Sequence, residues 1–252
     1  MGGSIGADYA ISESATLLGD PEFPKILDRA KFGERLLRVQ DLYRQYSRLD
    51  LTSDYDRPTA IDGLQQRLLR TMNVNGGFGI LDDPNNNEFL MRSLLWCREV
   101  GIRRLKPIAF PSDRERVPSW SWMSVSGRID YFRLELRQYD WQVIQPPWTF
   151  PSTNVSNAFR GLSRVFDLTG VRVNEEDVIF DNLLDSDITR CEAIVLGIEK
   201  GTQAIEDRKH YVLMVRPNGI HGPDGEVLYE RIGAGYASGR CLKGLSKICT
   251  LV

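Results

Sequence analysis

Five aromatic rings and one guanidinium are the side chains whose types and spacing point to a binding site. Tryptophan alternates with serine along Ser119–Trp122, and in an extended strand Trp120 and Trp122 would both lie on one face. Ligand pockets are mainly apolar and hold a few well-placed polar groups. We therefore predict an aromatic substrate pocket whose binding residues are Trp96, Trp120, Trp122, Tyr131, Trp148 and Arg231.

Each of these residues also has a purely structural interpretation. Aromatic side chains bury a large area and dominate ordinary cores, so Trp96, Trp120 and Trp122 fit core packing as well as a pocket. Arg231 offers a planar fork that can bind a carboxylate through two nitrogens, and pairing with a local acid is the alternative. Residue types alone leave both interpretations open.

Trp148 stands apart from the other tryptophans because it lies in a proline-rich stretch. Three prolines fall within residues 145–163, and they predict a long irregular loop. Loops of that length in compact domains often close over a ligand. We therefore expect Trp148 to be exposed and to contact a ligand or a partner.

Groups for acid–base, nucleophilic or metal chemistry are sparse. The chain has two histidines and four cysteines, and no Cys-x-x-Cys pair occurs, which predicts buried reduced thiols. Pro84 interrupts the acidic stretch Asp82–Glu88, so that stretch predicts a loop rather than a magnesium site. Asp185 and Asp187 fit either an acid–base pair or a solvated acidic loop. We assign no catalytic residue, no metal and no cofactor.

Length, charge and hydropathy exclude several classes of protein. The chain has 252 residues, 42% of them hydrophobic, and a formal net charge of −2. No basic run of the nucleic-acid-binding type is present, so we expect no nucleic-acid partner. No apolar run approaches the roughly 18 residues of a membrane span, and the N-terminus lacks a signal region. We therefore expect a cytoplasmic protein that contacts no membrane.

Hydrophobic periodicity divides the chain near residue 104. Apolar residues that recur every three to four positions predict helices over residues 31–47, 59–72 and 87–101. Beyond that point, short β-rich segments bounded by turn residues predict strands over residues 119–125, 128–136, 166–173, 193–198, 211–215 and 227–232. The Gly- and Pro-rich stretch 216–225 predicts a loop that joins two paired strands.

These elements predict an α+β fold. We expect residues 1–104 to form a mainly helical segment that packs on an antiparallel β-sandwich or a partly open β-barrel. Residues 105–252 would form that β-rich segment. The length permits one large domain or two closely packed units, and we expect one compact unit.

Four stretches, spread over roughly residues 30–252, carry a resemblance to a known family. They are the junction Tyr46–Gly63, the helix Leu94–Arg98, the tryptophan segment Val117–Gly127 and the segment Tyr229–Gly233. Their order and spacing resemble the C-terminal part of fungal heterokaryon-incompatibility (HET) proteins, with LLWCR where that family has GLLWRR and with YERIG unchanged. The N-terminal half of that family, which resembles TIR domains, has no counterpart in this sequence.

The resemblance implies a scaffold without its signalling half, and two functions then stay open. Fungal secondary metabolism recruits diverse folds as cofactor-independent cyclases, isomerases and Diels–Alder enzymes, which need orientation and a few hydrogen-bond donors. The first expectation is therefore a pericyclase-type enzyme that shapes an apolar terpenoid or polyene in the aromatic pocket. The alternative is a non-catalytic protein-interaction module related to heterokaryon incompatibility, with an exposed apolar patch and a protein partner.

Overall fold

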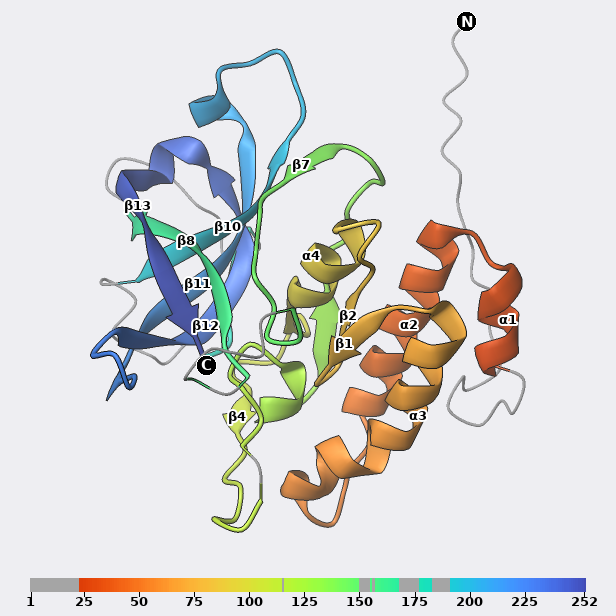
Figure 1. Cartoon of the computed structure of the whole chain (residues 1–252). Helices are drawn as coiled ribbons and strands as arrows, with labels where there is room; N and C mark the ends of the chain where they lie inside the picture. The colour runs from red at the N-terminus through yellow and green to blue at the C-terminus, as the bar shows by residue number, and fades with distance from the viewer. Residues whose placement is uncertain (1–22, 115, 150–154, 156, 168–176, 183–190) are drawn as a thin grey trace, which may run out of the picture.

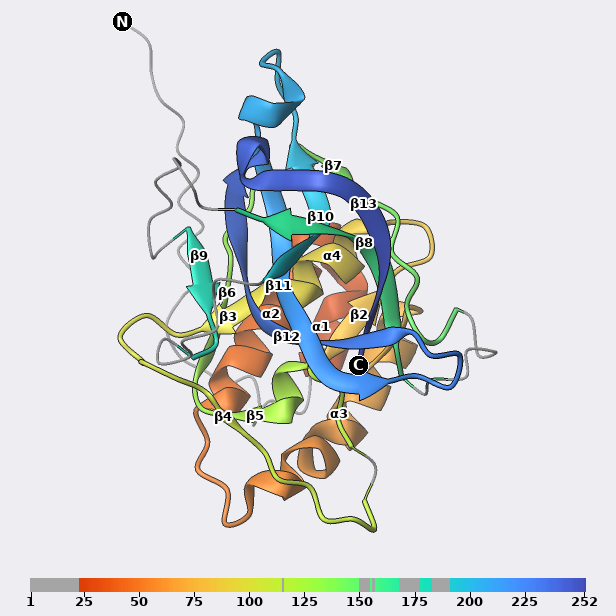
Figure 2. The ribbon, with the colours of Figure 1, turned by 90° about the vertical axis from the view of Figure 1, so that its left-hand side faces the viewer.

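Helices and a closed β-barrel occupy opposite ends of the molecule, which gives it an α+β fold (Figure 1). The computed structural model describes residues 23–114, 116–149, 155, 157–167, 177–182 and 191–252. Helices α1 to α3 lie side by side at one end, and the long strands of the barrel lie at the other (Figures 1 and 2). Helix α4 and short paired strands lie between them.

The helical end is formed by α1 (Phe23–Arg29), α2 (Phe32–Ser47) and α3 (Arg57–Met72). The helices predicted over residues 31–47 and 59–72 are confirmed. In α2 the apolar side chains at three- and four-residue spacing are buried, as in an amphipathic helix that packs on one side. Pro58 lies in the first turn of α3, and Asn73 ends that helix in the left-handed conformation at φ 53°.

Helix α4 (Glu88–Leu94) is shorter than expected, and the prediction of a helix over residues 87–101 is wrong beyond the end of α4. Leu95 leaves the helical region at φ −84° and ψ 44°, and Trp96–Arg98 forms strand β3. β3 pairs with β6 (Ile129–Tyr131), so a strand partner that is distant in sequence decides this segment. The same pairing joins the helical and the β-rich segments.

The barrel is a ring of paired strands in the order β11-β10-β8-β13-β12, closed where β12 pairs with β11. Its strands are β8 (Phe159–Phe166), β10 (Glu192–Glu199), β11 (Lys209–His221), β12 (Val227–Ser238) and β13 (Leu242–Leu251). Neighbouring strands are antiparallel except β12 and β13, which run parallel where Leu228 faces Thr250 and Tyr229 faces Leu251. The closed ring corrects the expectation of a sandwich or a partly open barrel.

Further strands extend or flank the barrel. β7 (Tyr139–Trp141) pairs with β10, and β9 (Val178–Phe180) pairs with β12. The short pairs beside the helices are β1 (Asn75–Gly77) with β2 (Ile80–Asp82), and β4 (Lys106–Pro107) with β5 (Val125–Ser126).

Most of the predicted barrel strands are present. Those expected over residues 193–198, 211–215 and 227–232 lie within β10, β11 and β12 and are confirmed. The stretch 216–225 does join two paired strands, although β11 continues into it before the chain turns. Most of the strand expected over residues 166–173 lies outside the described residues. Its first residue, Phe166, is the last residue of β8.

Two expectations on either side of β7 are corrected. The tryptophan stretch 119–125 is a turn followed by a 3₁₀ helix, η3 (Trp122–Ser124), because the Ser121 hydroxyl accepts a hydrogen bond from the Met123 amide at 3.0 Å and caps the turn. The loop expected over residues 145–163 ends earlier, because β8 already begins within it.

Two hydrophobic clusters pack on opposite faces of the barrel strands. On β11, Leu213 and Val215 belong to a large cluster that includes the helices, while Val212 and Met214 belong to a smaller one. This alternation is the period of two that a strand imposes. The large cluster therefore holds the helical end and the barrel together. No helix among the described residues is long and apolar enough to cross a bilayer.

Candidate functional site

The six predicted binding residues lie in one neighbourhood between the helices and the barrel, which we call the aromatic hub: Trp96, Trp120, Trp122, Tyr131, Trp148 and Arg231. Three of its indoles have an exposed fraction of 0%. The Trp96 indole nitrogen donates to the Trp120 carbonyl oxygen at 2.9 Å, and that of Trp120 donates to the Asn157 carbonyl oxygen at 3.0 Å. Buried tryptophans with a paired N–H, such as Trp96 and Trp120, are typical of a core, whereas the Trp122 N–H has no hydrogen-bond partner among the described residues.

Other aromatic rings surround the two tryptophans of the serine–tryptophan stretch. The Trp120 ring lies 4.6 Å from that of Phe159 and 5.7 Å from that of Phe78, both edge to face. The Trp122 ring lies 5.2 Å from that of Tyr43 on helix α2. Although the stretch is not a strand, both indoles are buried, because the turn and the 3₁₀ helix direct them into the same core.

Arg231 is the charged member of the aromatic hub, and its side chain is fully buried. Its guanidinium carbon lies 3.1 Å from the centroid of the Trp96 ring, and its Nη2 donates to the Trp96 carbonyl oxygen at 2.6 Å. Its Nη1 lies 3.3 Å from the Asp181 carboxylate, at ion-pair distance. Burial lowers the pKa of Arg231 to about 10, against the charge of Asp181, which raises it. The local acid expected as an alternative partner is therefore Asp181.

Tyr131 lies opposite Trp96 in the β3–β6 pair. Burial raises the pKa of Tyr131 well above its usual range, with smaller contributions from Tyr43 and Cys97. Burial also raises the pKa of the Cys97 thiol to about 12, so the thiol stays protonated and is a poor nucleophile. The hydroxyls of Tyr131 and Tyr43 have no hydrogen-bond partner within the described part of the chain.

Trp148 is half-buried rather than exposed. Its indole nitrogen donates to the Asp82 carboxylate at 2.7 Å, and its ring lies 6.4 Å from that of Trp120 and 5.8 Å from that of Phe159. Burial raises the pKa of Asp82, and the hydrogen bond from Trp148 opposes that effect. Trp148 thus anchors its loop to the hub, and the expectation of an exposed aromatic side chain is corrected.

The geometry of the aromatic hub favours packing over catalysis. Its members contact one another and the rings around them, and burial keeps the Tyr131 phenol and the neighbouring Cys97 thiol in their neutral forms. Its one ion pair is internal. The role of these six residues as substrate contacts stays a prediction.

An exposed apolar strip lies on the barrel instead, on strands β8 and β13. Leu162 and Ile248 face each other across the two strands, and 54% and 72% of their side chains are exposed. Val165 on β8 is 53% exposed, and Leu245 on β13 is 95% exposed. Leu245 protrudes because the pairing of β13 with β8 is interrupted between Lys243 and Lys247. We call Leu162, Ile248 and Leu245 the β8–β13 strip, because Val165, three residues after Leu162, lies on the other face of β8.

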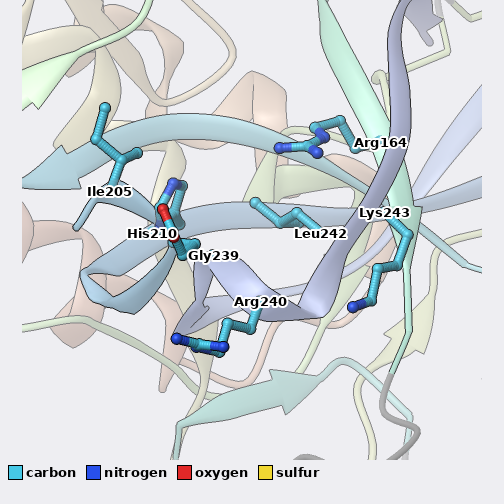
Figure 3. A pocket seen from close by; sticks show the side chains of 8 residues that line it. Arg164, Ile205, His210, Gly239, Arg240, Leu242 and Lys243 are labelled. Carbon is cyan, nitrogen blue, oxygen red and sulfur yellow. The ribbon is translucent and has the colours of Figure 1, made fainter.

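A hollow of about 600 Å³ opens next to this strip, at the mouth of the barrel (Figure 3). Arg164 at the end of β8, Lys243 at the start of β13 and His210 at the start of β11 line it. The His210 ring lies against Gly239, where an added Cβ would be only 2.5 Å from the imidazole Cε1. Burial lowers the pKa of His210, and the charges of Arg164 and Arg208 lower it further, while a hydrogen bond to the Arg208 carbonyl opposes them.

Among the residues that the structure describes, no group of three or more His, Cys, Asp or Glu side chains is placed to hold a metal ion. The four cysteines are buried and free, as expected from their spacing. Residues 84, 85 and 87 form turns, as predicted for a loop in the acidic stretch 82–88. Asp185 and Asp187 lie outside the described residues.

Sequence reasoning missed the strip and the hollow. The apolar and charged residues of the segment 242–248 alternate with glycine and serine, and they give no sharp strand signal. Arg164, His210 and Lys243 are far apart in the sequence, and only closure of the barrel brings them to one hollow. One sequence signal could have revealed the strip: the run 159–166 resembles a strand in which Leu162 and Val165 lie among basic residues.

No protein-family model, curated protein or solved structure matches this chain.

Proposed function

We propose that this chain is a non-catalytic protein-interaction module that binds its partner through the β8–β13 strip. The observation that carries the proposal is the cross-strand pair Leu162 and Ile248, whose side chains are both more than half exposed on adjacent strands. Contiguous apolar patches on the surface of a soluble protein mark interaction sites more often than isolated apolar side chains do. Leu245, which is 95% exposed in the interrupted part of β13, adds to the exposed apolar surface.

Charge at the rim of the strip indicates the chemistry of the partner. Arg164 lies two residues after Leu162 and therefore on the same face of β8. Lys247 lies beside Ile248 but is paired with Glu192 at 2.7 Å. A second copy of the chain would bring like charges together in a two-fold interface. We therefore infer a different protein, with a segment in which acidic side chains flank apolar ones.

The resemblance to HET proteins supports this kind of function. In our proposal the chain is related to the C-terminal part of that family and keeps its scaffold. The motif residues carry contacts that hold the scaffold together: the Tyr46 hydroxyl donates to the Arg57 carbonyl oxygen at 2.8 Å, and Arg231 contacts Trp96. These residues are buried, and a partner therefore has to use other surfaces, such as the strip.

The cofactor-independent cyclase stays a second prediction. It needs an apolar hollow beside Trp120 and Trp122, and the rings of Phe159, Tyr43 and their neighbours occupy the space next to those indoles. Nothing in the geometry of the hub favours it over core packing. We therefore place the interaction module first.

Peptide display on the immobilised chain tests the proposal. We expect selection of peptides in which Asp or Glu flanks Leu, Ile or Phe. Their binding should weaken about tenfold or more in the double variant Leu162→Ser, Ile248→Ser, a loss of about 1.4 kcal/mol. The matched control is Val100→Ser, Val143→Ser, which alters two side chains that are 78% and 80% exposed on other surfaces.

Several outcomes would overturn the proposal. One is the absence of any enriched peptide, and another is equal binding of the peptides by the strip variant and the wild type. Sedimentation velocity supplies the third, because a concentration-dependent dimer that the strip variant abolishes would make the occupant a second copy of the chain. Thermal melting of both double variants checks that neither substitution unfolds the protein.

A further inference from the structure

The hollow at the barrel mouth has the size and the charge of a site for a small organic anion. Its volume of about 600 Å³ lies within the roughly 300–1,000 Å³ typical of small-molecule pockets and far exceeds the volume of a single inorganic ion. Five segments of the chain contribute to its wall, among them the 3₁₀ helices η5 (Ile205–Asp207) and η6 (Gly239–Cys241). Figure 3 shows Arg164 and Lys243 on one side and His210 with Arg240 on the other.

Two of the cations in this wall are free to meet a ligand. Among the described residues, neither Arg164 nor Lys243 has a carboxylate at ion-pair distance. The Arg164 Nε donates to the Gly244 carbonyl oxygen at 3.3 Å, which orients the guanidinium and leaves its terminal nitrogens available. The third cation, Arg240, is paired with Asp207 at 2.5 Å. Arg164 and Lys243 thus give the wall of the hollow a guanidinium and an ammonium, the two kinds of side chain that bind phosphate.

The rest of the wall specifies more than a phosphate. Ile205 and Leu242 present apolar surface to the hollow, which suits the carbon skeleton of a ligand. Glu206 adds a carboxylate that can accept hydrogen bonds from ligand hydroxyls. Hydroxyl groups, a short carbon skeleton and a doubly charged anionic group together describe a phosphorylated polyol or sugar.

We propose that the mouth of the barrel binds a small hydroxylated organic phosphate, with Arg164 and Lys243 as the ligands of its phosphate group. The site adjoins the β8–β13 strip and shares Arg164 with its rim, but the inference does not depend on the proposed function. The His210 side chain can report on a bound anion. His210 lies in the same wall, and the charged groups that face it are Arg164, Arg208, Glu206, Arg240 and Lys243.

Ring-proton NMR of the two histidines tests the proposal, with His221 as the internal reference because it is exposed on another part of the surface. A phosphate in the hollow offsets the positive charges around His210 and raises the pKa of that residue. At pH 7 we expect ribose 5-phosphate to move the His210 signal toward the protonated position, saturably, while the His221 signal stays in place. Ribose without phosphate should move neither signal.

Variants assign the site. Arg164→Gln together with Lys243→Gln should weaken ribose 5-phosphate binding about tenfold or more. The charge-preserving pair Arg164→Lys, Lys243→Arg should retain most of it. Lys106→Gln, which removes an exposed cation from strand β4, is the control and should bind like the wild type. Thermal melting confirms that the variants fold.

Three results would overturn the proposal. The first is a shift of both histidine signals that does not saturate and that sodium chloride reproduces at equal ionic strength. The second is unchanged affinity in the double Gln variant. The third is equal affinity for inorganic phosphate and ribose 5-phosphate, because the apolar wall and Glu206 would then contribute nothing.

Discussion

Replacing Arg231 with methionine tests the central contact of the aromatic hub. The substitution keeps most of the side-chain volume but removes the charge that faces Asp181 at 3.3 Å and the donor to the Trp96 carbonyl oxygen at 2.6 Å. Asp181 then remains largely buried without its closest cation. Because removing one partner of a buried pair leaves an uncompensated charge, the folded state loses far more than it would from an exposed pair.

The expected loss follows from these contacts. Breaking a buried ion pair costs about 3–5 kcal/mol, and leaving the Trp96 carbonyl without a donor costs about 1–3 kcal/mol. Arg98 also lowers the pKa of Asp181. Arg98 therefore compensates part of the negative charge that the substitution leaves unpaired. We therefore expect Arg231→Met to lower the free energy of unfolding by about 4 kcal/mol, or the melting temperature by about 10 °C.

The loss should depend on pH in a defined direction. Burial raises the pKa of Asp181, and Arg231 is the largest of the causes that lower it. Without Arg231 the pKa of Asp181 in the folded state rises further. A carboxyl group whose pKa is raised by folding binds more protons folded than unfolded, so stability increases as the pH falls from the folded pKa toward the unfolded one. The destabilisation by Arg231→Met should therefore shrink between pH 7 and pH 4.

Urea unfolding followed by circular dichroism measures these effects. Arg133→Met, which alters an exposed arginine, is the control and should change the free energy of unfolding by less than about 0.5 kcal/mol. Adding Asp181→Asn to Arg231→Met should recover at least about 1 kcal/mol, since it removes the unpaired charge. A loss below about 1 kcal/mol for Arg231→Met, or a double variant that loses the sum of both single effects, would refute the ion-pair reasoning.

The remaining predictions concern the walls of the hub. Gly79→Ala should lower the free energy of unfolding by about 3 kcal/mol, because φ at Gly79 is 79° and the added Cβ would lie 2.1 Å from the indole nitrogen of Trp122. Gly101→Ala, at φ 91° in open space, should lose only about 1 kcal/mol, and equal losses in urea unfolding would contradict the packing argument. Trp148→Phe should lose about 1–2 kcal/mol with the hydrogen bond to Asp82. Trp141→Phe should lower the free energy of unfolding by less than Trp148→Phe. A larger loss for Trp141→Phe would contradict a stabilising role of the hydrogen bond from Trp148 to Asp82.

Local signals were sufficient for helices α2 and α3 and for the central hairpin, but they did not reveal α1. Helix α2 and helix α3 follow from apolar periodicity with Pro58 at the start of α3, and the turn residues between β11 and β12 mark their connection. The end of α4 depends instead on the pairing of Trp96 with Tyr131, and closure of the ring depends on two parallel pairs at the C-terminal end of β13. Pairings between distant residues leave no periodicity in either partner, so the sequence does not reveal them.

The composition of the hub could be predicted, but its role could not. Residue types placed Trp96, Trp120 and Arg231 together correctly, because large aromatic side chains gather wherever a core forms. Whether such a gathering encloses a space or fills one depends on contacts of a few ångströms, such as the 4.6 Å between the rings of Trp120 and Phe159. Spacing along the chain carries no information at that scale.

The stretches that suggest the family resemblance contact one another in the core, and one of them, Tyr229–Gly233, belongs to barrel strand β12. The Tyr46 side chain bonds to the start of α3 and lies 6.0 Å from the Trp122 ring, the Trp96 nitrogen bonds to Trp120, and Arg231 on β12 lies against Trp96. Each contact links two segments that are distant in sequence, so each restricts what can replace it. Because these core residues are occupied with one another, we propose that binding uses the surface, where the β8–β13 strip and the barrel mouth are the candidate sites.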